Sequence, residues 1–308
     1  MHHPRRQSVI GILYPGEMGS SFGKLLAENG FRVITTTNGR SPRTQGLCRE
    51  ARLSVADSLP NLLERSDAVI SLVSPAAALQ VARNVAELFQ GSRRRLLYID
   101  ANSISPMTAI QISEELSCAP IDFVDAAFFG LASQLRQRGT LCLSGSRAEE
   151  LARELAGVIT VKIAGEAPGQ ASAFKMIISG IPKGLVGLFV ETMLFAREMA
   201  LLPEALETCN EIYPALMEVI NRMLPTYPQH AARRSQELRE VEETMSLNGL
   251  EPRVVRAARE ITASLARINW ATTVEPRHWT IAEIIEQVHR GTVHTPGATP
   301  GHSSEALA

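Results

Sequence analysis

Short apolar runs alternate with helical patterns over the first half of the chain. The apolar runs are Ser8 to Leu13, FRVITT, SDAVISLV, RRLLYIDA and IDFVDAAFF. The helical patterns between them lie at Leu59 to Leu63, Ala76 to Phe89 and Pro106 to Leu116. This alternation predicts an α/β fold of the Rossmann type, in which a doubly wound parallel sheet carries helices on both faces.

The pattern changes near the middle of the chain. GTLCLSG and GVITVKIAG read as two more strands around a helix at Ala148 to Leu155, and strand signals stop after Gly169. From Gln170 to Val288 the pattern is helical, interrupted at Pro203 and at LPTYPQ, NGLEP and TTVEP. We therefore predict an α/β domain over residues 1–167 and an all-α domain over 168–290. The Gly- and Pro-rich segment 291–308 is expected to be a disordered tail.

Composition narrows the class of protein. The chain has 308 residues, 45% hydrophobic and 20% charged, which suits a soluble protein of two domains. Its net charge of −1 gives no reason to expect a nucleic-acid partner. Cys48, Cys118, Cys142 and Cys209 form no CxxC pair, so we expect a cytoplasmic protein without a metal. The longest apolar region, Ala171 to Ala200, is interrupted by charged residues, and we expect no membrane partner.

The first strand leads into a loop that nearly matches GxGxxG, the turn that binds the pyrophosphate of a dinucleotide. Gly16 and Gly19 occupy the second and third glycine positions, but Tyr14 occupies the first. Pro15 is expected to replace part of what the missing glycine supplies, because proline fixes φ. The alternative is an ordinary strand–turn–helix. The predicted cofactor contacts here are Tyr14, Pro15, Gly16, Glu17, Met18 and Gly19.

Three more loops follow strands, where doubly wound sheets bind their ligands. Thr35 to Arg43 contains no acidic residue that could hold the ribose 2′-hydroxyl of NAD. Its arginines and hydroxyls suit the 2′-phosphate of NADP instead, so NADP is the predicted cofactor and NAD is less favoured. The alternative is that these arginines are only solvated. The predicted contacts from the three loops are Asn38, Arg40, Ser41, Val73, Ser74, Pro75 and Asn102.

Together these loops resemble the β-hydroxyacid dehydrogenase and 6-phosphogluconate dehydrogenase superfamily. YPGEMG is similar to the HPGEMG-like loop of one poorly characterised branch, which implies that the branch dispenses with the first glycine. The resemblance of IDANSISP implies that Asn102 and Ser103 lie near nicotinamide and substrate. Phe129 and Gly130 stand where the superfamily has a Ser-Gly-Gly substrate loop, so the substrate contacts here are altered.

GQASAFKMIISG resembles the catalytic helix of the superfamily. The resemblance implies that Lys175 is the general acid/base and that Ser179 replaces a substrate-binding asparagine. Lys183 follows where phosphogluconate enzymes have a substrate-contacting tyrosine. Steps of four residues bring the three side chains to one helix face. A helical lysine is more often an exposed surface residue, but this chain has only four lysines and Lys175 has apolar neighbours. The predicted catalytic residues are Lys175, Ser179 and Asn102.

HAARRSQELREVEETM is the remaining candidate segment. His230 and Arg234 are predicted to help bind an anionic substrate at a homodimer interface, since the enzymes that this chain resembles interleave their helical domains. The alternative is a solvated helix with pairs such as Arg233 with Glu237.

These features predict an NADP-preferring oxidoreductase that transfers hydride between the cofactor and a small hydroxy acid or a related carbonyl compound. Imine reduction on the same fold is one alternative. A catalytically inactive NADP-binding sensor or scaffold is the other, favoured by Tyr14, Ser179 and Phe129.

Overall fold

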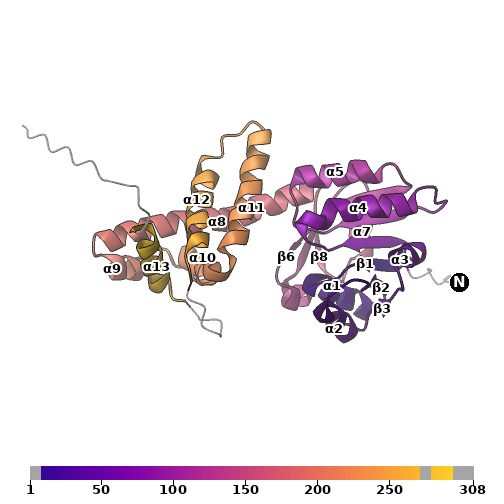
Figure 1. Ribbon diagram of the computed structural model, residues 1–308, viewed down its shortest axis with the longest axis horizontal. Coiled ribbons are helices and arrows are strands. Elements are labelled where there is room, and N and C mark those ends of the chain that lie inside the picture. Colours follow the sequence, from indigo (N-terminus) through magenta and orange to yellow (C-terminus); the bar gives the residue numbers. More distant parts are fainter. Residues whose placement is uncertain (1–7, 271–278, 294–308) are drawn as a thin grey trace, which may run out of the picture. The chain divides into compact units, whose positions relative to one another are not determined.

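A computed structural model describes residues 8–270 and 279–293 of the chain. The chain divides into two compact units between Ile177 and Ile178, within one continuous helix. The first unit is a sheet with helices on both faces, and the second is helical (Figure 1). The predicted break near Gly169 comes earlier than this division, because the first two turns of the shared helix belong to the first unit.

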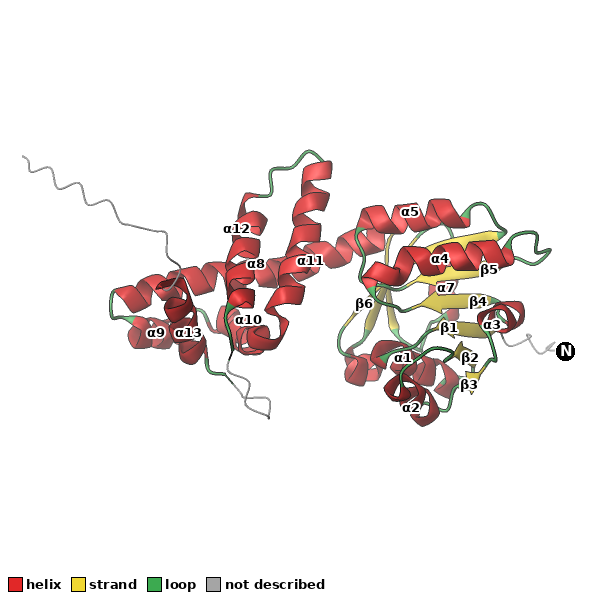
Figure 2. Ribbon diagram, in the orientation of Figure 1, coloured by secondary structure: helices red, strands yellow, loops and turns green. Residues whose placement is uncertain are grey.

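The first unit has one eight-stranded sheet, in the order β3-β2-β1-β4-β5-β6-β7-β8 (Figure 2). All neighbouring strands are parallel except β6 and β7. This is the predicted Rossmann-type sheet with one antiparallel pair added. The strands are β1 (Val9–Leu13), β2 (Arg32–Thr36), β3 (Ser54–Val55), β4 (Ala68–Ser71), β5 (Leu96–Asp100), β6 (Ile121–Phe129), β7 (Thr140–Ser144) and β8 (Thr160–Gly165).

Alternate strand residues build two cores on opposite faces of this sheet. Ile10 and Ile12 of β1 pack with Phe22 on the side of α1 and α7, whereas Leu13 packs with Leu63 and Ile112 on the side of α3, α4 and α5. The period of two along a strand separates the two sets. The helices are α1 (Glu17–Glu28), α2 (Pro42–Glu50), α3 (Leu59–Arg65), α4 (Pro75–Phe89), α5 (Pro106–Leu116), α6 (Leu135–Arg138) and α7 (Ala148–Glu154), with a 3₁₀ turn at Ala132–Gln134.

Some elements differ from the sequence prediction. Helix α1 begins at Glu17, so Glu17, Met18 and Gly19 of the predicted loop belong to its first turn. Helix α2 and strand β3 lie where no element is predicted, although Ser41 caps α2 and Pro42 occupies its first turn, as helix starts prefer. Arg43 is therefore a helical residue and not part of an open loop.

All the regular elements described in the second unit are helices, as predicted. Its core includes Val190, Ile220, Tyr227, Leu265 and Ile284, all fully buried or nearly so. The predicted break TTVEP and the tail from residue 294 lie outside the described residues, and the last helix extends to Val293. The helices are α8 (Gln170–Glu198), α9 (Leu202–Ile212), α10 (Pro214–Met223), α11 (Tyr227–Leu247), α12 (Arg253–Arg267) and α13 (Ile281–Val293), with a 3₁₀ turn at Leu224–Thr226.

Helix α8 has an exposed apolar surface. By length and composition alone it could cross a membrane, with a mean hydropathy of 1.5 over 18 residues, of which 33% are buried. Long core helices of soluble proteins share these properties, so one such helix is weak evidence for a membrane. The exposed apolar side chains on the part of α8 in the second unit are Ile178, Ile181, Leu188 and Phe195.

Candidate active site

The turn between β1 and α1 keeps the shape of a glycine turn without its first glycine. Tyr14 has φ 50°, in the left-handed region that glycine prefers. For a residue with a side chain this conformation costs about 1–2 kcal/mol. The missing glycine is therefore replaced by a strained Tyr14, and Pro15 does not supply the positive φ.

The other two glycines have different structural reasons. A Cβ on Gly19 would lie 2.9 Å from Pro15 Cβ and 3.4 Å from Ile12 Cγ2, so this glycine lets α1 pack against β1. A Cβ on Gly16 would meet nothing within 4 Å. Gly16 caps α1, whose first helical hydrogen bond runs from Ser20 N to Gly16 O at 2.9 Å. The preceding N–H groups are those that a helix offers to an anion.

The loop between β2 and α2 contacts this turn through its arginines. The guanidinium carbon of Arg40 lies 4.0 Å from the centroid of the Tyr14 ring. Arg43 Nη2 lies 4.0 Å from Glu17 Oε2, with both side chains largely exposed. Asn38 and Ser41 help to build the loop, since Asn38 Nδ2 donates to the Asp57 carbonyl and Ser41 Oγ accepts from Thr44 N at 3.3 Å.

A buried network joins the ends of β4 and β5. Asn102 donates from Nδ2 to Asp100 Oδ2 at 2.9 Å and to Ser71 Oγ at 3.0 Å, and its Oδ1 accepts from Val73 N at 2.6 Å. Burial raises the pKa of Asp100 to about 7, although hydrogen bonds from Asn102 oppose the shift. Asn102 therefore joins the loop after β4, through Val73 and Ser71, to the loop after β5. Ser74 and Pro75 follow as the cap and first residue of α4.

A second buried carboxylate anchors the start of α8. Asp125 of β6 accepts from Ser172 Oγ at 2.7 Å, from Ser172 N at 2.9 Å and from Ser144 Oγ at 3.2 Å. A carboxylate at a helix N-terminus also interacts favourably with the helix dipole. Gly169, at φ 88°, lets the chain that enters α8 pass close to the start of α5, because a Cβ there would lie 2.8 Å from the Pro106 carbonyl oxygen. Burial raises the pKa of Asp125 above its ordinary value, and these donors oppose the shift.

This anchoring brings Lys175 to the loop after β5. Lys175 Nζ donates to Ser103 Oγ at 2.8 Å, and both residues belong to the first unit. Ser103 is exposed and directly follows the buried Asn102. The predicted acid/base and two residues of the predicted DANSISP site thus lie at the carboxyl edge of the sheet. Ser179, one turn further along α8, belongs to the second unit.

The end of β6 is aromatic. The Phe129 ring packs edge to face on Phe174, with ring centroids 5.7 Å apart, and both rings pack against the buried cluster of Ala127, Cys142 and Ala171. Phe174 directly precedes Lys175. Gly130 has φ 108°, so the turn after β6 needs a glycine. The segment that the resemblance marks as an altered substrate loop therefore forms an aromatic wall beside the helix that carries Lys175.

The second unit gathers the other predicted substrate residues around Glu237. Lys183 is only 5% exposed, pairs with Glu237 Oε2 at 3.1 Å and donates to the Ser179 carbonyl at 2.9 Å. Arg233 also pairs with Glu237, at 2.7 Å. Arg234 donates to Thr226 Oγ1 at 2.8 Å.

The cluster around Glu237 has an excess of positive charge. Burial and the charges of Arg234 and Arg233 lower the pKa of Lys183, against the effect of Glu237. Burial and the same arginines lower the pKa of His230. Lys183, His230 and Arg234 thus lie near one another. Lys183 is buried in an ion pair between α8 and α11 and is not a surface lysine.

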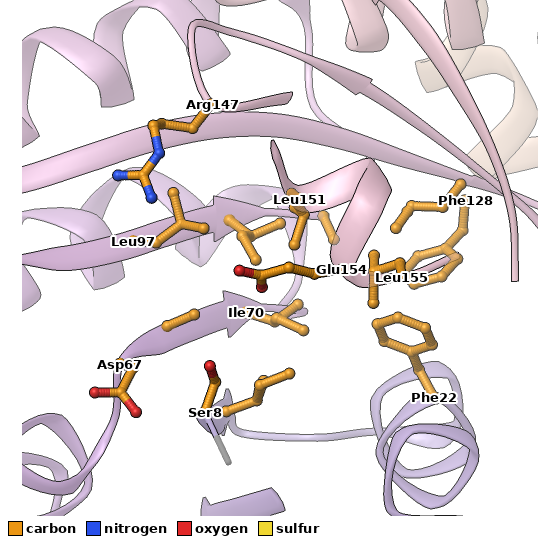
Figure 3. A pocket seen from close by; sticks show the side chains of 15 residues that line it. Ser8, Phe22, Asp67, Ile70, Leu97, Phe128, Arg147, Leu151, Glu154 and Leu155 are labelled. Carbon is orange, nitrogen blue, oxygen red and sulfur yellow. The ribbon is translucent and has the colours of Figure 1, made fainter. Parts of the chain in front are cut away.

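A cavity of about 210 Å³ lies on the sheet face between α1 and α7 (Figure 3). Phe22, Phe128 and Leu151 line its apolar part, and Asp67 and Arg147 lie among its polar lining. None of the predicted cofactor contacts lines it, so this cavity is separate from the loops described above.

A comparison with protein families identifies the first unit. The family model for the NAD binding domain of 6-phosphogluconate dehydrogenase matches residues 8–162. The chain belongs to this family. Its first unit is an NAD(P)-binding domain of the oxidoreductase type. A second family model, for a domain of unknown function, matches residues 196–265 of the helical unit.

Relatives of this family member cover most of its length. An uncharacterised 28.5 kDa protein of Methanothermus fervidus is 25% identical over 253 residues, which are 82% of this chain and 96% of the relative. A second relative is a solved conserved protein of unknown function, described as structurally similar to 3-hydroxyacid dehydrogenases. It is 28% identical with a TM-score of 0.70, and the match covers 83% of this chain and 96% of that one. A conserved hypothetical protein of Sinorhizobium meliloti is 25% identical with a TM-score of 0.74, covering 93% and 97%.

More distant solved structures show the fold alone. They include a 3-hydroxyisobutyrate dehydrogenase of Salmonella typhimurium, at 19% identity and TM-score 0.65, covering 91% of this chain and 99% of that one. An imine reductase of Myxococcus stipitatus in complex with NADP⁺ is 17% identical, at TM-score 0.56, with the same coverage. A variant of that enzyme is in complex with NAD⁺. The fold therefore serves both cofactors and more than one reaction.

Sequence reasoning missed the two buried carboxylates and the partner of Lys183. Asp100 ends one apolar strand and Asp125 lies within another, and an acid in such a run is a signal that hydrogen-bond donors lie nearby. The pairing of Lys183 with Glu237 could not be predicted from the sequence, because the two residues lie 54 positions apart on different helices that only the fold brings together.

Proposed function

We propose that the chain is an NADP-preferring oxidoreductase acting on a small anionic hydroxyl or carbonyl compound, with Lys175 as general acid/base. The observation that carries this proposal is the 2.8 Å hydrogen bond from Lys175 Nζ to Ser103 Oγ at the carboxyl edge of an NAD(P)-binding sheet. A proton-transfer group at that edge, beside the loops that face a dinucleotide, is what a dehydrogenase needs.

The loops fit a dinucleotide phosphate. Gly16 has room for close backbone approach, and the first turn of α1 offers its N–H groups to the pyrophosphate. Arg40 and Ser41 supply donors suited to a 2′-phosphate. A bound nicotinamide would supply or accept the hydride.

Lys175 accounts for the proton. When a hydroxyl-bearing carbon is oxidised, the hydroxyl O–H bond breaks, and neutral Lys175 Nζ takes the proton. In reduction, protonated Lys175 returns it to the oxygen. Ser103 orients the lysine through the hydrogen bond between them. Asn102 contributes by fixing the loop that carries Ser103, since its own carboxamide is engaged within the protein.

The cluster around Glu237, within the second unit, suits an anionic group. Lys183, Arg233 and Arg234 outnumber that carboxylate, and their charges repel one another at short range. An added anion reduces this repulsion. We propose His230, Arg234 and Lys183 as the side chains that favour the anion, with Lys183 acting through the field of its charge.

We also propose that the helical unit forms a homodimer in the cytoplasm. Ile181, Leu188 and Phe195 of α8 are 59%, 60% and 66% exposed, and a second copy would cover such a stripe. The four cysteines are unpaired, as in a reducing compartment.

Imine reduction is the second candidate, and the Phe129 and Phe174 pair favours it. An aromatic wall without a hydroxyl suits an apolar cyclic imine better than a hydroxy acid. Turnover of cofactor with small hydroxy acids, 2-keto acids and cyclic imines, each offered with NADPH or NADP⁺ as the direction requires, separates the candidates. Preferred turnover of an acid supports the proposal, and turnover of imines alone contradicts it. Absence of turnover with every compound would favour a binding protein without catalysis.

Cofactor choice has its own test. Binding of NADPH is expected to be at least tenfold tighter than that of NADH, about 1.4 kcal/mol, because Arg40 can pair with the 2′-phosphate. Arg40→Asp is expected to abolish or reverse the preference. Equal affinities in the unaltered protein would contradict the NADP assignment.

A further inference from the structure

Tyr14 is strained and yet its side chain is well placed. The residue adopts φ 50°, which glycine would adopt freely, and its half-buried ring packs against the apolar core on the side of α3 and α4. Non-glycine residues persist in this conformation where surrounding contacts hold them, and such residues gather at functional sites. The ring supplies packing that a glycine at this position would lack.

The other side of the ring faces Arg40. The guanidinium carbon lies 4.0 Å from the ring centroid, within the range of a cation–π contact. Arg40 is exposed, and its guanidinium forms no ion pair with any residue in the described part of the chain. The Glu17 carboxylate, at the start of α1, lies 4.0 Å from Arg43 Nη2 instead.

The backbone of the loop is held independently of the ring. Arg40 N donates to the Thr37 carbonyl at 3.0 Å, and the Arg40 carbonyl accepts from Gln45 Nε2 at 3.0 Å. Gly39, at φ 71°, forms the turn between them. These contacts fix where the Arg40 side chain begins but not where its long, flexible side chain points. The Tyr14 ring is the contact that fixes the guanidinium.

We propose that Tyr14 is a positioning residue for cofactor selectivity, acting through Arg40; this inference rests on the proposed NADP preference. A guanidinium is planar, with two faces and an edge of N–H donors. The Tyr14 ring covers one face. The opposite face remains for stacking on the adenine, and the edge remains for the 2′-phosphate.

Holding Arg40 in place before binding removes the entropy cost of ordering a long side chain. The benefit falls on NADP, which has a 2′-phosphate, and not on NAD, which has a hydroxyl there. Loss of the ring is therefore expected to reduce the NADP-to-NAD selectivity by roughly two- to fivefold, the size of one exposed cation–π contact.

The test compares Tyr14→Leu with Tyr14→Phe in the full chain. Both variants keep a bulky residue at the same backbone position, but only phenylalanine keeps an aromatic face. Affinities for NADP⁺ and NAD⁺ are measured by titration calorimetry, also in an Arg40→Ala background. We expect Tyr14→Leu to weaken NADP⁺ alone, Tyr14→Phe to match the parent, and Tyr14→Leu to have no further effect once Arg40 is alanine.

Three results would overturn the inference: equal behaviour of the leucine and phenylalanine variants, equal weakening of both cofactors, or a leucine effect that persists without Arg40. If the unaltered protein binds both cofactors equally and Arg40→Ala changes neither, the proposed NADP preference itself fails, and the inference with it. Should Tyr14→Leu not fold, Tyr14→Gly replaces it, because glycine adopts φ 50° without strain.

Discussion

Lys175 and Ser103 are joined by a 2.8 Å hydrogen bond between Nζ and Oγ, although 72 residues separate them in the sequence. The contact depends on two anchors. Asp125 accepts hydrogen bonds from Ser172 in the first turn of α8, the helix that carries Lys175. Asp100 accepts a hydrogen bond from the backbone N–H of Asn102, the residue before Ser103. Each buried carboxylate thus places one partner of the exposed pair.

Replacing Lys175 tests its role as the acid/base. Lys175→Met is expected to lower kcat by roughly 10²–10⁴, the usual contribution of a positioned proton donor. The affinity for NADPH should stay nearly unchanged, because Lys175 is not one of the predicted cofactor contacts. Lys162→Met, at an exposed lysine of β8, is the matched control and should leave both quantities unaltered. Near-normal turnover by well-folded Lys175→Met would remove the mechanism proposed above.

The two glycines of the β1–α1 turn should respond differently to alanine. Gly19→Ala is expected to lower the thermal midpoint, since its Cβ would lie 2.9 Å from Pro15 Cβ. Gly16→Ala should leave the midpoint nearly unchanged but weaken NADPH binding, because its Cβ meets no protein atom and would instead face the pyrophosphate. Calorimetric unfolding and cofactor titration measure the two effects. Intact cofactor affinity in Gly16→Ala would contradict the predicted binding loop.

Removal of Asp125 tests the anchor of α8. Asp125→Ala leaves the buried Ser172 N–H and two hydroxyls without their acceptor, so we expect a loss of about 2–5 kcal/mol in the free energy of unfolding. Asp57→Ala, at an exposed aspartate of the same unit, should cost less than about 0.5 kcal/mol. Urea unfolding gives both values. Equal, small losses would show that α8 is held by its apolar contacts instead.

The raised pKa of Asp100 predicts a dependence of stability on pH. Its pKa rises from 3.8 to about 7 in the folded protein, chiefly through burial, with the facing carboxylate of Asp125 adding to the shift. Between these values the folded state holds the proton and the unfolded state has lost it. The contribution of this group to stability therefore falls as pH rises from about 4 to about 7, and levels off above that.

Asp100→Asn removes this titration. The difference in unfolding free energy between the parent and Asp100→Asn should change steadily from pH 5 to pH 7 in the direction that disfavours the parent, and then become constant. Urea unfolding at four pH values between 5 and 8 measures it. A difference that does not vary with pH would mean that Asp100 is not protonated in the folded state.

The exposed stripe on α8 predicts self-association. Leu188→Glu together with Phe195→Glu is expected to convert a dimer into a monomer, since a second copy would have to bury both charges. Leu88→Glu changes an exposed leucine of similar kind on α4 and should leave the dimer intact. Light scattering at micromolar concentration gives the mass. A monomer in the unaltered protein would contradict the proposal.

The sequence determined the Rossmann-type sheet and the helical second unit, because apolar periodicity is a local property of each strand and helix. It also predicted a binding loop from Tyr14 to Gly19, and it placed Asn102 and Ser103 after a strand, at the edge that the carboxyl ends of parallel strands share. The short elements α2 and β3 were not predicted, because few apolar residues mark them.

Only the tertiary structure decided which side chains meet. The contact of Tyr14 with Arg40, the pairing of Lys183 with Glu237 and the anchoring of Ser172 by Asp125 each join residues on different elements. Helical spacing placed Lys183 on a face of α8, but burial of that face depends on the helix that packs against it. The positive φ of Tyr14 is likewise a tertiary outcome, since a tyrosine by itself avoids that conformation and only its surroundings hold it there.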